Sequence, residues 1–350
     1  MGGRLSKADR LAKRRSAMID KQIEEDFRQR KRECTVLLLG SSGSGKSTIM
    51  RQMVIANQGG FSACERVEWR PVIYWNVLES AQAVLVYLRK IGLGSHCEVL
   101  NQALLNNLPK FQLEMLKGPA VLPAEITEAI HWVWKTTGDH FGDLYPQDST
   151  RYFLDEVLRI GQGGYLPSET DVLKARWKAS AIQEVKLTMG LLSIRMVGVS
   201  GQFSERKRWI HCFESATSIV FCTAMSDYDQ VLLAERTQNR MLESLVLFES
   251  VINSRWFRRT SIVLLLTKID VFKNKLPKVP LEFYFPEYTG GSDINKAVKF
   301  ILWKFMQANR ARLSVYPHIA SLHDLTTIRL IFAAVKETIL QNALKDSGIL

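Results

Sequence analysis

Residues 40–47 form a glycine-rich loop of the kind that binds phosphate. They read Gly-Ser-Ser-Gly-Ser-Gly-Lys-Ser, which fits the pattern G-x-x-x-x-G-K-[ST]. The run before them, 34–39, is apolar and β-prone, and the segment after them, 47–53, lacks Gly and Pro and can open a helix. In this setting the backbone N–H groups curl around phosphate oxygens, Lys46 reaches the β and γ phosphates, and Ser47 can offer its hydroxyl to Mg²⁺. The loop predicts a bound nucleoside triphosphate, against the alternative of a Ser/Gly-rich surface turn.

A second candidate site, at residues 267–270, ends an apolar stretch late in the chain. These residues read Thr-Lys-Ile-Asp. Asp270 can accept two N–H bonds from the edge of guanine, which adenine cannot supply, while Lys268 could lay its stem over the base and Thr267 could brace the loop. The motif T-K-x-D is weak alone, but after a buried strand and downstream of a phosphate loop it favours guanine. It argues against a P-loop kinase, which would bind adenine nucleotides.

The overall composition is that of an ordinary globular chain long enough for two domains. It has 350 residues, of which 46% are hydrophobic and 23% charged. No stretch is long and apolar enough to predict a membrane span, and the charged N-terminus does not resemble a secretory signal. The five cysteines are odd in number and lack C-x-x-C spacing, so we expect a reduced compartment rather than disulfides or a zinc site.

The positive charge is concentrated at the N-terminus. The net charge is +12, and residues 1–32 contribute +6 through eleven Lys/Arg and five acids. Ile19, Ile23 and Phe27 recur at i+4 as an apolar stripe, and the first six residues fit the N-myristoylation pattern with Gly2 as acceptor. Because one acyl chain holds a membrane only marginally and a basic patch is a recognised second signal, we expect attachment to a membrane surface. The alternatives are a solvated helix and a nucleic-acid-binding arm.

Hydrophobic spacing divides the chain into α/β segments and an all-helical segment. From about 58 to 173 the apolar residues recur at spacings of three and four residues, which indicates helices and no convincing strand. Strand patterns return after residue 173. We therefore expect an α/β fold with an open, mostly parallel sheet and an inserted helical domain. The expected strands are 34–39, 193–199, 219–223 and 262–267, and the expected helices are 7–32, 77–88, 125–134, 151–158, 239–248 and 325–344, with a further helix cap at Ser168.

Several longer stretches make the chain similar, end to end, to the α subunits of heterotrimeric G proteins. Long matches of this kind are far more specific than short motifs. The resemblance implies a P-loop GTPase (Ras-like) domain at 34–57 and 174–350, a helical domain at 58–173 that covers the nucleotide like a lid, and an N-terminal helix at 1–33. The resembling stretches are residues 171–176, 204–214, 226–229, 239–241, 285–288 and 342–350.

The resemblance implies a GTPase mechanism with two catalytic side chains. Arg176 would neutralise charge on the transferring γ-phosphoryl group, and Gln202 would orient the attacking water, as in G-protein α subunits generally. Without the resemblance, Arg176 could equally be a solvated linker arginine and Gln202 a polar residue that caps a helix. The implied cofactors are GTP or GDP and Mg²⁺.

The resemblance also implies which residues contact the nucleotide. Ser47 would ligate the metal. Asp148 and Ser149 match helical-domain residues that approach the nucleotide, although an ordinary helix N-cap pair is an equal alternative. The implied nucleotide contacts are Gly40, Ser41, Ser42, Gly43, Ser44, Gly45, Lys46, Ser47, Thr48, Asp148, Ser149, Leu173, Lys178, Gly201, Thr267, Lys268, Asp270 and Leu322.

The implied partners are a βγ dimer, a seven-helix receptor and a downstream effector. Trp209, Ile210 and the N-terminal helix match the surface that grips βγ, although Trp209 could simply belong to the core. The C-terminal helix and tail match the segment that enters an activated receptor. With Gly2 acylated, we expect the protein at the cytoplasmic face of the plasma membrane, with no nucleic-acid partner.

The chain departs from the family in the predicted phosphate and base contacts. Ser42 and Gly43 stand where the family has Gly and then Glu, so Arg176 loses a carboxylate partner. Thr267 replaces an Asn whose amide ties loops together. Leu322 replaces a small Ala and would crowd the base, which favours fast release of GDP.

The predicted magnesium site departs further. Ala179 stands where the family has a magnesium-binding Thr, and Gly198 stands where it has the Asp that holds the ion's hydration shell. Ser200 replaces a Gly that lets the following segment swing toward the γ-phosphate. Ser47 is then the remaining protein ligand, and we expect slow hydrolysis. The alternative is a pseudo-GTPase scaffold that binds βγ and receptor but barely cycles.

Overall fold

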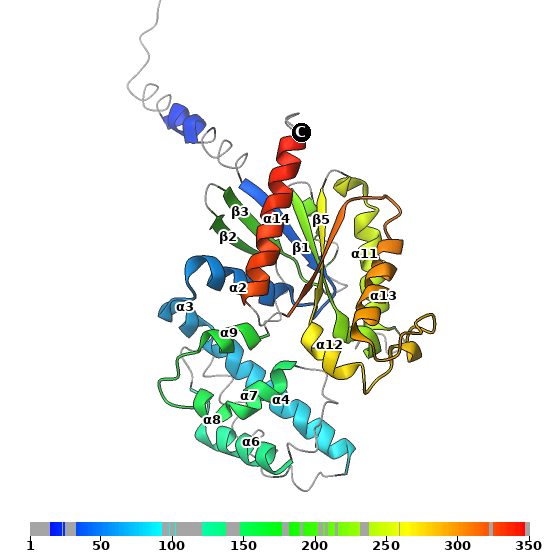
Figure 1. Ribbon diagram of the computed structural model, residues 1–350. Coiled ribbons are helices and arrows are strands. Elements are labelled where there is room, and N and C mark those ends of the chain that lie inside the picture. The colour runs from blue at the N-terminus through cyan, green and yellow to red at the C-terminus, as the bar shows by residue number, and fades with distance from the viewer. Residues whose placement is uncertain are drawn as a thin grey trace, which may run out of the picture.

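The computed structural model is built around one mixed β-sheet (Figure 1). Among the described residues six strands form this sheet, in the order β2-β3-β1-β4-β5-β6, and every neighbouring pair is parallel except β2 with β3. The strands are β1 (Glu33–Gly40), β2 (Gln183–Met189), β3 (Leu192–Gly198), β4 (Ser218–Ala224), β5 (Ser261–Thr267) and β6 (Val315–Ala320). The structure describes residues 15–22, 24, 33–92, 98, 102, 121–137, 148–176, 182–189, 192–201, 206, 209–213, 216–231, 238–258, 260–321 and 325–346.

Helices cover both faces of the sheet. The helices α2 and α14 lie on one face, and α11 and α13 lie on the other (Figure 1). Alternate residues of β1 point to opposite faces: Val36 and Leu38 join an apolar cluster with α2 and α14, while Leu37 and Leu39 join another with α11 and α13. Burying both faces explains why β1, β4 and β5 contain continuous apolar runs. The helices of this part are α2 (Lys46–Gln58), α10 (Ile210–Phe213), α11 (Arg240–Ile252), α12 (Ile269–Lys275), α13 (Ile294–Gln307) and α14 (Leu325–Asp346), with short 3₁₀ turns η4 (Met225–Asp229), η5 (Arg255–Phe257) and η6 (Leu281–Phe283).

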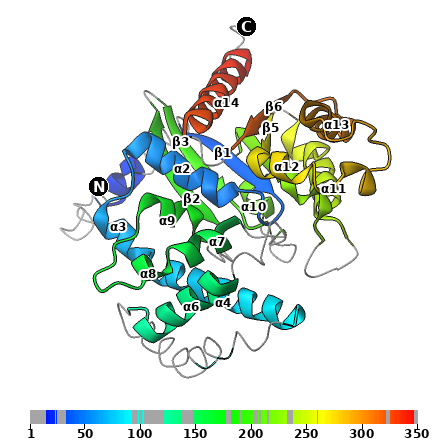
Figure 2. The same cartoon turned by 60° about the horizontal axis from the view of Figure 1, so that its bottom comes forward.

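The described chain between α2 and β2 is helical and has a core of its own. Ile73, Val77, Ile130 and Phe153 are fully buried within it, in a cluster separate from those of the sheet. Figure 2 shows the helices of this part gathered together beside the sheet. The helix α9 begins at a capping box, in which the Ser168 hydroxyl accepts from the Asp171 N–H and the Asp171 carboxylate accepts from the Ser168 N–H. The helices are α3 (Ala63–Glu68), α4 (Arg70–Lys90), α6 (Ala124–Thr137), α7 (Asp148–Asp155), α8 (Val157–Ile160) and α9 (Glu169–Lys174).

The expected α/β class with a mostly parallel sheet is confirmed. The four expected strands are β1, β3, β4 and β5, and the cap at Ser168 is present. The single helix expected at 151–158 is wrong: it is interrupted at Glu156, whose ψ of 6° leaves the helical region, and Arg159 then bonds both Glu156 and Asp171. Two strands, β2 and β6, were not expected. Of the expected N-terminal helix, 15–22 and 24 are helical, and the rest lies outside the described residues.

The strand order fixes where a ligand can bind. The carboxyl ends of the parallel strands β1, β3, β4, β5 and β6 open on the same edge of the sheet. Ligands of open α/β sheets bind outside this edge. The 40–47 loop follows β1 here, and residues 267–270 lie at the end of β5. The fold therefore brings the two candidate motifs to one edge.

Candidate nucleotide-binding site

The 40–47 loop has the backbone curl that a phosphate cradle needs. Gly40 has φ 139°, and a Cβ atom there would lie 2.1 Å from the carbonyl oxygen of Cys222 in β4, so only glycine fits. Gly45 is left-handed (φ 95°) and caps the N-terminus of α2, whose first turn carries Ser47 and Thr48, both half-buried. The unpaired N–H groups and the dipole at this helix end favour an anion.

Lys46 lies inside the loop. Its ammonium donates to the carbonyl oxygens of Gly40 (2.8 Å) and Ser41 (2.7 Å) and to the Ser44 hydroxyl (3.2 Å). Burial lowers the pKa of Lys46 to about 8, with a smaller lowering by the nearby Arg206 guanidinium. Burial therefore disfavours the charged ammonium of Lys46, and an anion bound beside it would stabilise that charge.

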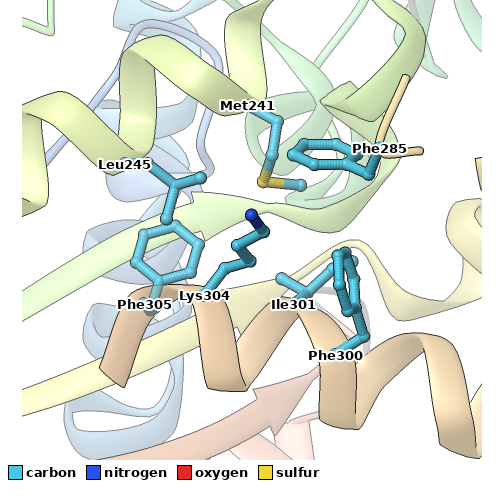
Figure 3. Close-up of a pocket in the computed structure, with 7 residues that line it drawn as sticks. All are labelled: Met241, Leu245, Phe285, Phe300, Ile301, Lys304 and Phe305. Atoms are coloured by element: carbon cyan, nitrogen blue, oxygen red, sulfur yellow. The ribbon is translucent and has the colours of Figure 1, made fainter. Parts of the chain in front are cut away.

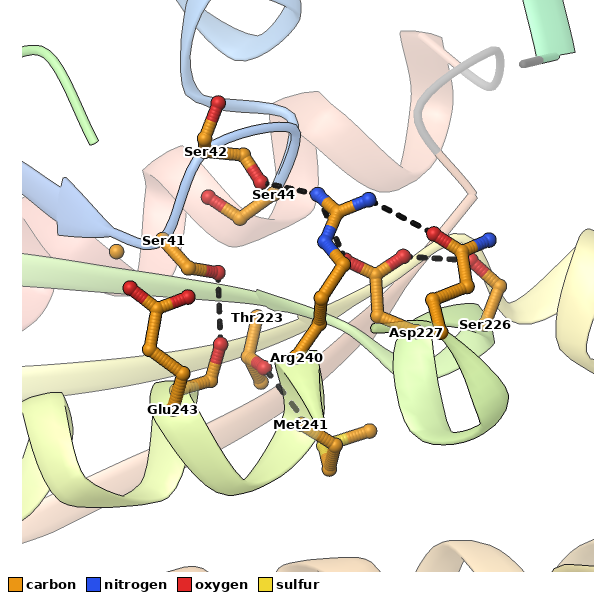
Figure 4. A network of polar contacts seen from close by, with 12 residues as sticks. Ser41, Ser42, Ser44, Thr223, Ser226, Asp227, Arg240, Met241 and Glu243 are labelled. Atoms are coloured by element: carbon orange, nitrogen blue, oxygen red, sulfur yellow. Dashed lines mark hydrogen bonds and ion pairs between the residues drawn. The ribbon is translucent and has the colours of Figure 1, made fainter. Parts of the chain in front are cut away.

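Two side chains from α11 hold the first half of the loop (Figure 4). The hydroxyls of Ser41 and Ser244 are 2.7 Å apart and buried, and the Arg240 guanidinium donates to the carbonyl oxygen of Ser42 at 2.6 Å. Gly43 makes room for this guanidinium, because a Cβ atom at Gly43 would lie 2.7 Å from its Nη2. The loop is therefore braced by a helix almost 200 residues away in the chain.

Arg240 is itself held by polar groups that follow β4. Its guanidinium lies 3.2 Å from the carboxylate of Asp227 (Figure 4). It also donates to the side-chain oxygen of Gln230 at 2.7 Å. Asp227 is buried in η4, so its charge needs this partner. Asn239 begins α11 by capping it, accepting from the N–H groups of Met241 and Leu242. Arg240 is thereby fixed at the first position of the helix.

Residues 267–270 lie at the end of β5, and Thr267 braces the second half of the loop. The Thr267 hydroxyl contacts the carbonyl oxygens of Ser44 (2.9 Å) and Thr223 (3.2 Å), which joins the loop to two strands. Lys268 adopts the left-handed region (φ 58°) and caps α12, and Asp270 lies half-buried in the first turn of that helix. The expectation that Thr267 braces the loop is confirmed.

The segment after β3 touches the loop directly. A Cβ atom at Gly201 would lie 2.5 Å from the backbone nitrogen of Ser42, so this approach requires glycine. Arg206 donates to the carbonyl oxygen of Gly201 (3.4 Å) and forms an ion pair with Glu243 of α11. Trp209 is 4% exposed and packs into the core, which in this structure agrees with the core alternative rather than with an exposed grip.

Arg176 is positioned through its backbone. The side chain of Asn76, on α4, donates to the Arg176 carbonyl oxygen and accepts from the Arg176 N–H, both at 2.9 Å. Upstream, the buried Arg51 of α2 donates to the carbonyl oxygens of Val172 (2.7 Å), Leu173 (3.1 Å) and Ala175 (2.6 Å). The helix that begins in the phosphate loop thus holds the chain that leads into Arg176.

Asp171 is the polar centre of the helical part. Arg159 binds it with two nitrogens, at 2.7 and 3.0 Å, and the hydroxyls of Tyr152 (2.7 Å) and Tyr165 (2.8 Å) also donate to it. Burial by itself would raise the pKa of Asp171, but these hydrogen bonds, with that from the Ser168 N–H, outweigh it and lower the pKa to about 2. The carboxylate ties α7, α8 and α9 together.

A small apolar hollow lies between α11 and α13, away from the loop (Figure 3). The one charged side chain on its wall, Lys304, forms an ion pair with Glu287 and lies over the ring of Phe300. It has no group arranged for a phosphate. The lining residues are Met241, Leu245, Phe285, Phe300, Ile301, Lys304 and Phe305.

Comparison with known proteins identifies the family. The family model described as G-protein alpha subunit matches residues 13–339. The chain belongs to this family. It is 55% identical over 343 residues to a guanine nucleotide-binding protein subunit alpha of Cryptococcus neoformans, covering 97% of this chain and 79% of that one. It is 53% identical to the alpha-3 subunit of Ustilago hordei over the whole of both chains, and 45% identical to the alpha-2 subunit of Saccharomyces cerevisiae, covering 91% and 73%.

This α subunit is a guanine-nucleotide-binding GTPase of heterotrimeric signalling. Its family acts with βγ dimers, receptors and effectors and associates peripherally with membranes. In the part of the chain that the structure describes, no helix has the length and hydropathy to cross a bilayer. The comparisons favour the signalling GTPase over the pseudo-GTPase alternative.

The structure brings some of the predicted site residues together at the 40–47 loop. For the others, contact with the nucleotide stays a prediction. Gly201, Thr267 and the 40–47 residues are in contact, and Leu173 touches Arg51. Ser149 is buried in α7, so its contact with the nucleotide stays a prediction. Gln202, Lys178, Ala179, Leu322, Gly2 and the side chains of Asp148 and Ile210 lie outside the described residues.

Sequence reasoning missed the residues that brace the site. Arg240 lies within residues 239–241, a stretch that resembles the family, so the sequence could have marked it as a site residue. Ser244, one turn further along α11, carries no motif of its own. Arg51 and Asn76 act on backbone carbonyl and amide groups, which any sequence supplies, and no pattern in the sequence marks them.

The described residues do not fit the magnesium site that is typical of the family. In P-loop GTPases the P-loop Ser/Thr and a carboxylate at the end of a strand hold the ion. Ser47 is present, but the strand position is Gly198, and Met50 fills the space beside it. Within the described ranges, no three His, Cys, Asp or Glu residues gather as a metal site. Ser47 as a metal ligand therefore stays a prediction.

Proposed function

We propose that this α subunit is a slow guanine-nucleotide switch whose phosphate chain lies in the 40–47 loop. The observation that carries the proposal is the ammonium of Lys46, which is buried inside a loop of glycines at a helix N-terminus. The base would lie against Lys268 and Asp270, at the neighbouring strand end. Thr267 supports this placement, because its hydroxyl joins that strand end to the phosphate loop.

Hydrolysis would depend on two side chains of this chain. Arg176 would reach the γ-phosphate and neutralise the charge that develops there, and Gln202 would orient the attacking water. Asn76 supports the first role, since it holds the backbone of Arg176 on both its N–H and its carbonyl. We expect a slow rate, because Gly43 stands in the loop where the family has a Glu.

The switch would work at a membrane. Acylation of Gly2, together with the basic N-terminal segment, would hold the protein at the cytoplasmic face of the plasma membrane. The C-terminal helix α14 packs along α2, which begins in the phosphate loop. A receptor that engages the end of α14 would therefore act on the loop through α2 and release GDP.

The test is single-turnover hydrolysis of GTP by the full chain, with ATP as the competing nucleotide. We expect slow release of phosphate from GTP that ATP does not inhibit. Arg176→Ala lowers the rate by about tenfold or more, because charge stabilisation is lost. Arg255→Ala, an exposed arginine outside the site, is the matched control and leaves the rate unchanged. Equal rates for Arg176→Ala and wild type would contradict the assignment.

A further inference from the structure

The thioether of Met50 fills the corner between α2 and the end of β3. A Cβ atom at Gly198 would lie 2.4 Å from the Met50 sulfur and 3.5 Å from its methyl carbon. Met50 is 3% exposed and belongs to the apolar cluster that also contains Ile194 and Met196 of β3. No side chain can be added at Gly198 unless the methionine moves.

This corner adjoins the phosphate loop. Gly198 ends β3 and pairs with Leu38, two residues before Gly40. Met50 lies one helical turn after Lys46 on α2. The corner is therefore the place from which a carboxylate on β3 would face the phosphates and any cation on them. Among the described residues, the side chain that fills it is the uncharged thioether of Met50.

A corner filled by a thioether is a poor binding site for Mg²⁺. This hard ion takes oxygen ligands and is usually bound through one or two carboxylates together with the substrate phosphates. Two described carboxylates beside the loop are already paired, Glu243 with Arg206 and Asp227 with Arg240. A thioether is a soft donor and does not replace them.

We infer that this chain binds guanine nucleotides with little dependence on Mg²⁺, because the Met50–Gly198 packing has replaced the carboxylate side of the metal site. Lys46 and the N–H groups at the start of α2 then supply the positive potential for the phosphates. This inference rests on the proposed binding of the nucleotide in the 40–47 loop.

The experiment is a titration of the full chain with a fluorescent analogue of non-hydrolysable GTP, in excess Mg²⁺ and in excess EDTA. We expect the two Kd values to agree within about threefold. A Kd that rises tenfold or more in EDTA overturns the inference and leaves the proposed function standing. Absence of binding in both buffers overturns the proposed function, so the two failures are distinguishable.

Two variants test the assignment to Met50 and Gly198. The double variant Met50→Ala with Gly198→Asp makes room for a carboxylate, and we expect Mg²⁺ to tighten its binding by about tenfold. Met50→Ala alone opens the corner without a carboxylate and stays insensitive to Mg²⁺. Circular dichroism of each variant confirms folding, and the wild-type titration decides the question if the double variant does not fold. A folded double variant that ignores Mg²⁺ would overturn the assignment.

Discussion

The Ser41 hydroxyl lies 2.7 Å from the Ser244 hydroxyl, at a point where both side chains are buried. One belongs to the phosphate loop and the other to the middle of α11, 203 residues further along the chain. A buried hydroxyl that loses its partner keeps the cost of desolvation, whereas removal of both hydroxyls can be nearly neutral. The pair therefore couples the loop to the helix.

Ser244→Ala leaves the Ser41 hydroxyl buried without this partner. We expect it to lower the free energy of unfolding by about 1–2 kcal/mol and to speed the release of GDP. The double variant Ser41→Ala with Ser244→Ala recovers most of the stability. Urea denaturation and the dissociation rate of fluorescent GDP measure the two effects. Ser250→Ala, whose hydroxyl bonds a carbonyl of its own helix, is the control, and additive losses in the double variant would refute the coupling.

Arg240→Ala removes the guanidinium that braces the loop at Ser42 and pairs with the buried Asp227. We expect a loss of about 2–3 kcal/mol in the free energy of unfolding, since a charged hydrogen bond is lost and a buried charge loses its partner. Arg240→Lys recovers only part of this, because an ammonium cannot make the forked contacts. Thermal unfolding measures the losses, with Arg310→Ala on the surface as control. Full recovery by lysine would contradict the geometry.

Sequence reasoning identified the centre of the sheet and missed its edges, for a physical reason. The four expected strands are the four central ones. Three of them, β1, β4 and β5, are apolar runs buried on both faces, and β3 alternates. The two strands it missed are the edges: β2 alternates apolar and polar residues, and β6 contains Pro317. The phosphate loop could also be predicted, because its residues form a continuous motif. The Ser41–Ser244 and Met50–Gly198 contacts could not be predicted, because they join residues far apart in sequence, and neither Ser244 nor Met50 belongs to a motif.

Arg51→Met tests whether α2 positions the chain that leads into Arg176. The guanidinium of Arg51 donates to the carbonyl oxygens of Val172 and Ala175, and methionine leaves these buried acceptors without it. We expect a loss of about 2 kcal/mol in stability and slower single-turnover hydrolysis of GTP. Arg151→Ala, whose side chain is 81% exposed, leaves both unchanged. An unaltered hydrolysis rate in a destabilised Arg51→Met variant would separate stability from positioning and contradict the expectation.

The buried Lys46 predicts that nucleotide affinity falls at alkaline pH. Burial lowers its pKa to about 8 from an ordinary 10.5, so above pH 8 the free protein carries a neutral amine. Bound phosphates favour the ammonium, so binding above pH 8 must take up a proton, and the affinity falls by up to about tenfold per pH unit. The nucleotide-free fold becomes more stable over pH 8 to 10.5, because there the unfolded lysine still binds a proton.

Calorimetric titration with GDP at pH 7 and pH 9 measures this dependence. Two buffers with different ionisation enthalpies report the proton uptake directly. Lys46→Arg is the matched control, because its guanidinium stays charged across this range and should give a flatter profile. The same affinity at both pH values for the wild type, without proton uptake, would show that Lys46 does not face the phosphates.

The central claim is that a guanosine phosphate lies in the 40–47 loop against Lys46. The most direct measurement is the nucleotide content of the purified full chain, released by heat and identified by chromatography, for the wild type, Lys46→Ala and the surface control Lys273→Ala. We predict guanosine nucleotide with the wild type and Lys273→Ala, and its loss from Lys46→Ala. No guanosine nucleotide in the wild type, or unchanged content in Lys46→Ala, would contradict the claim.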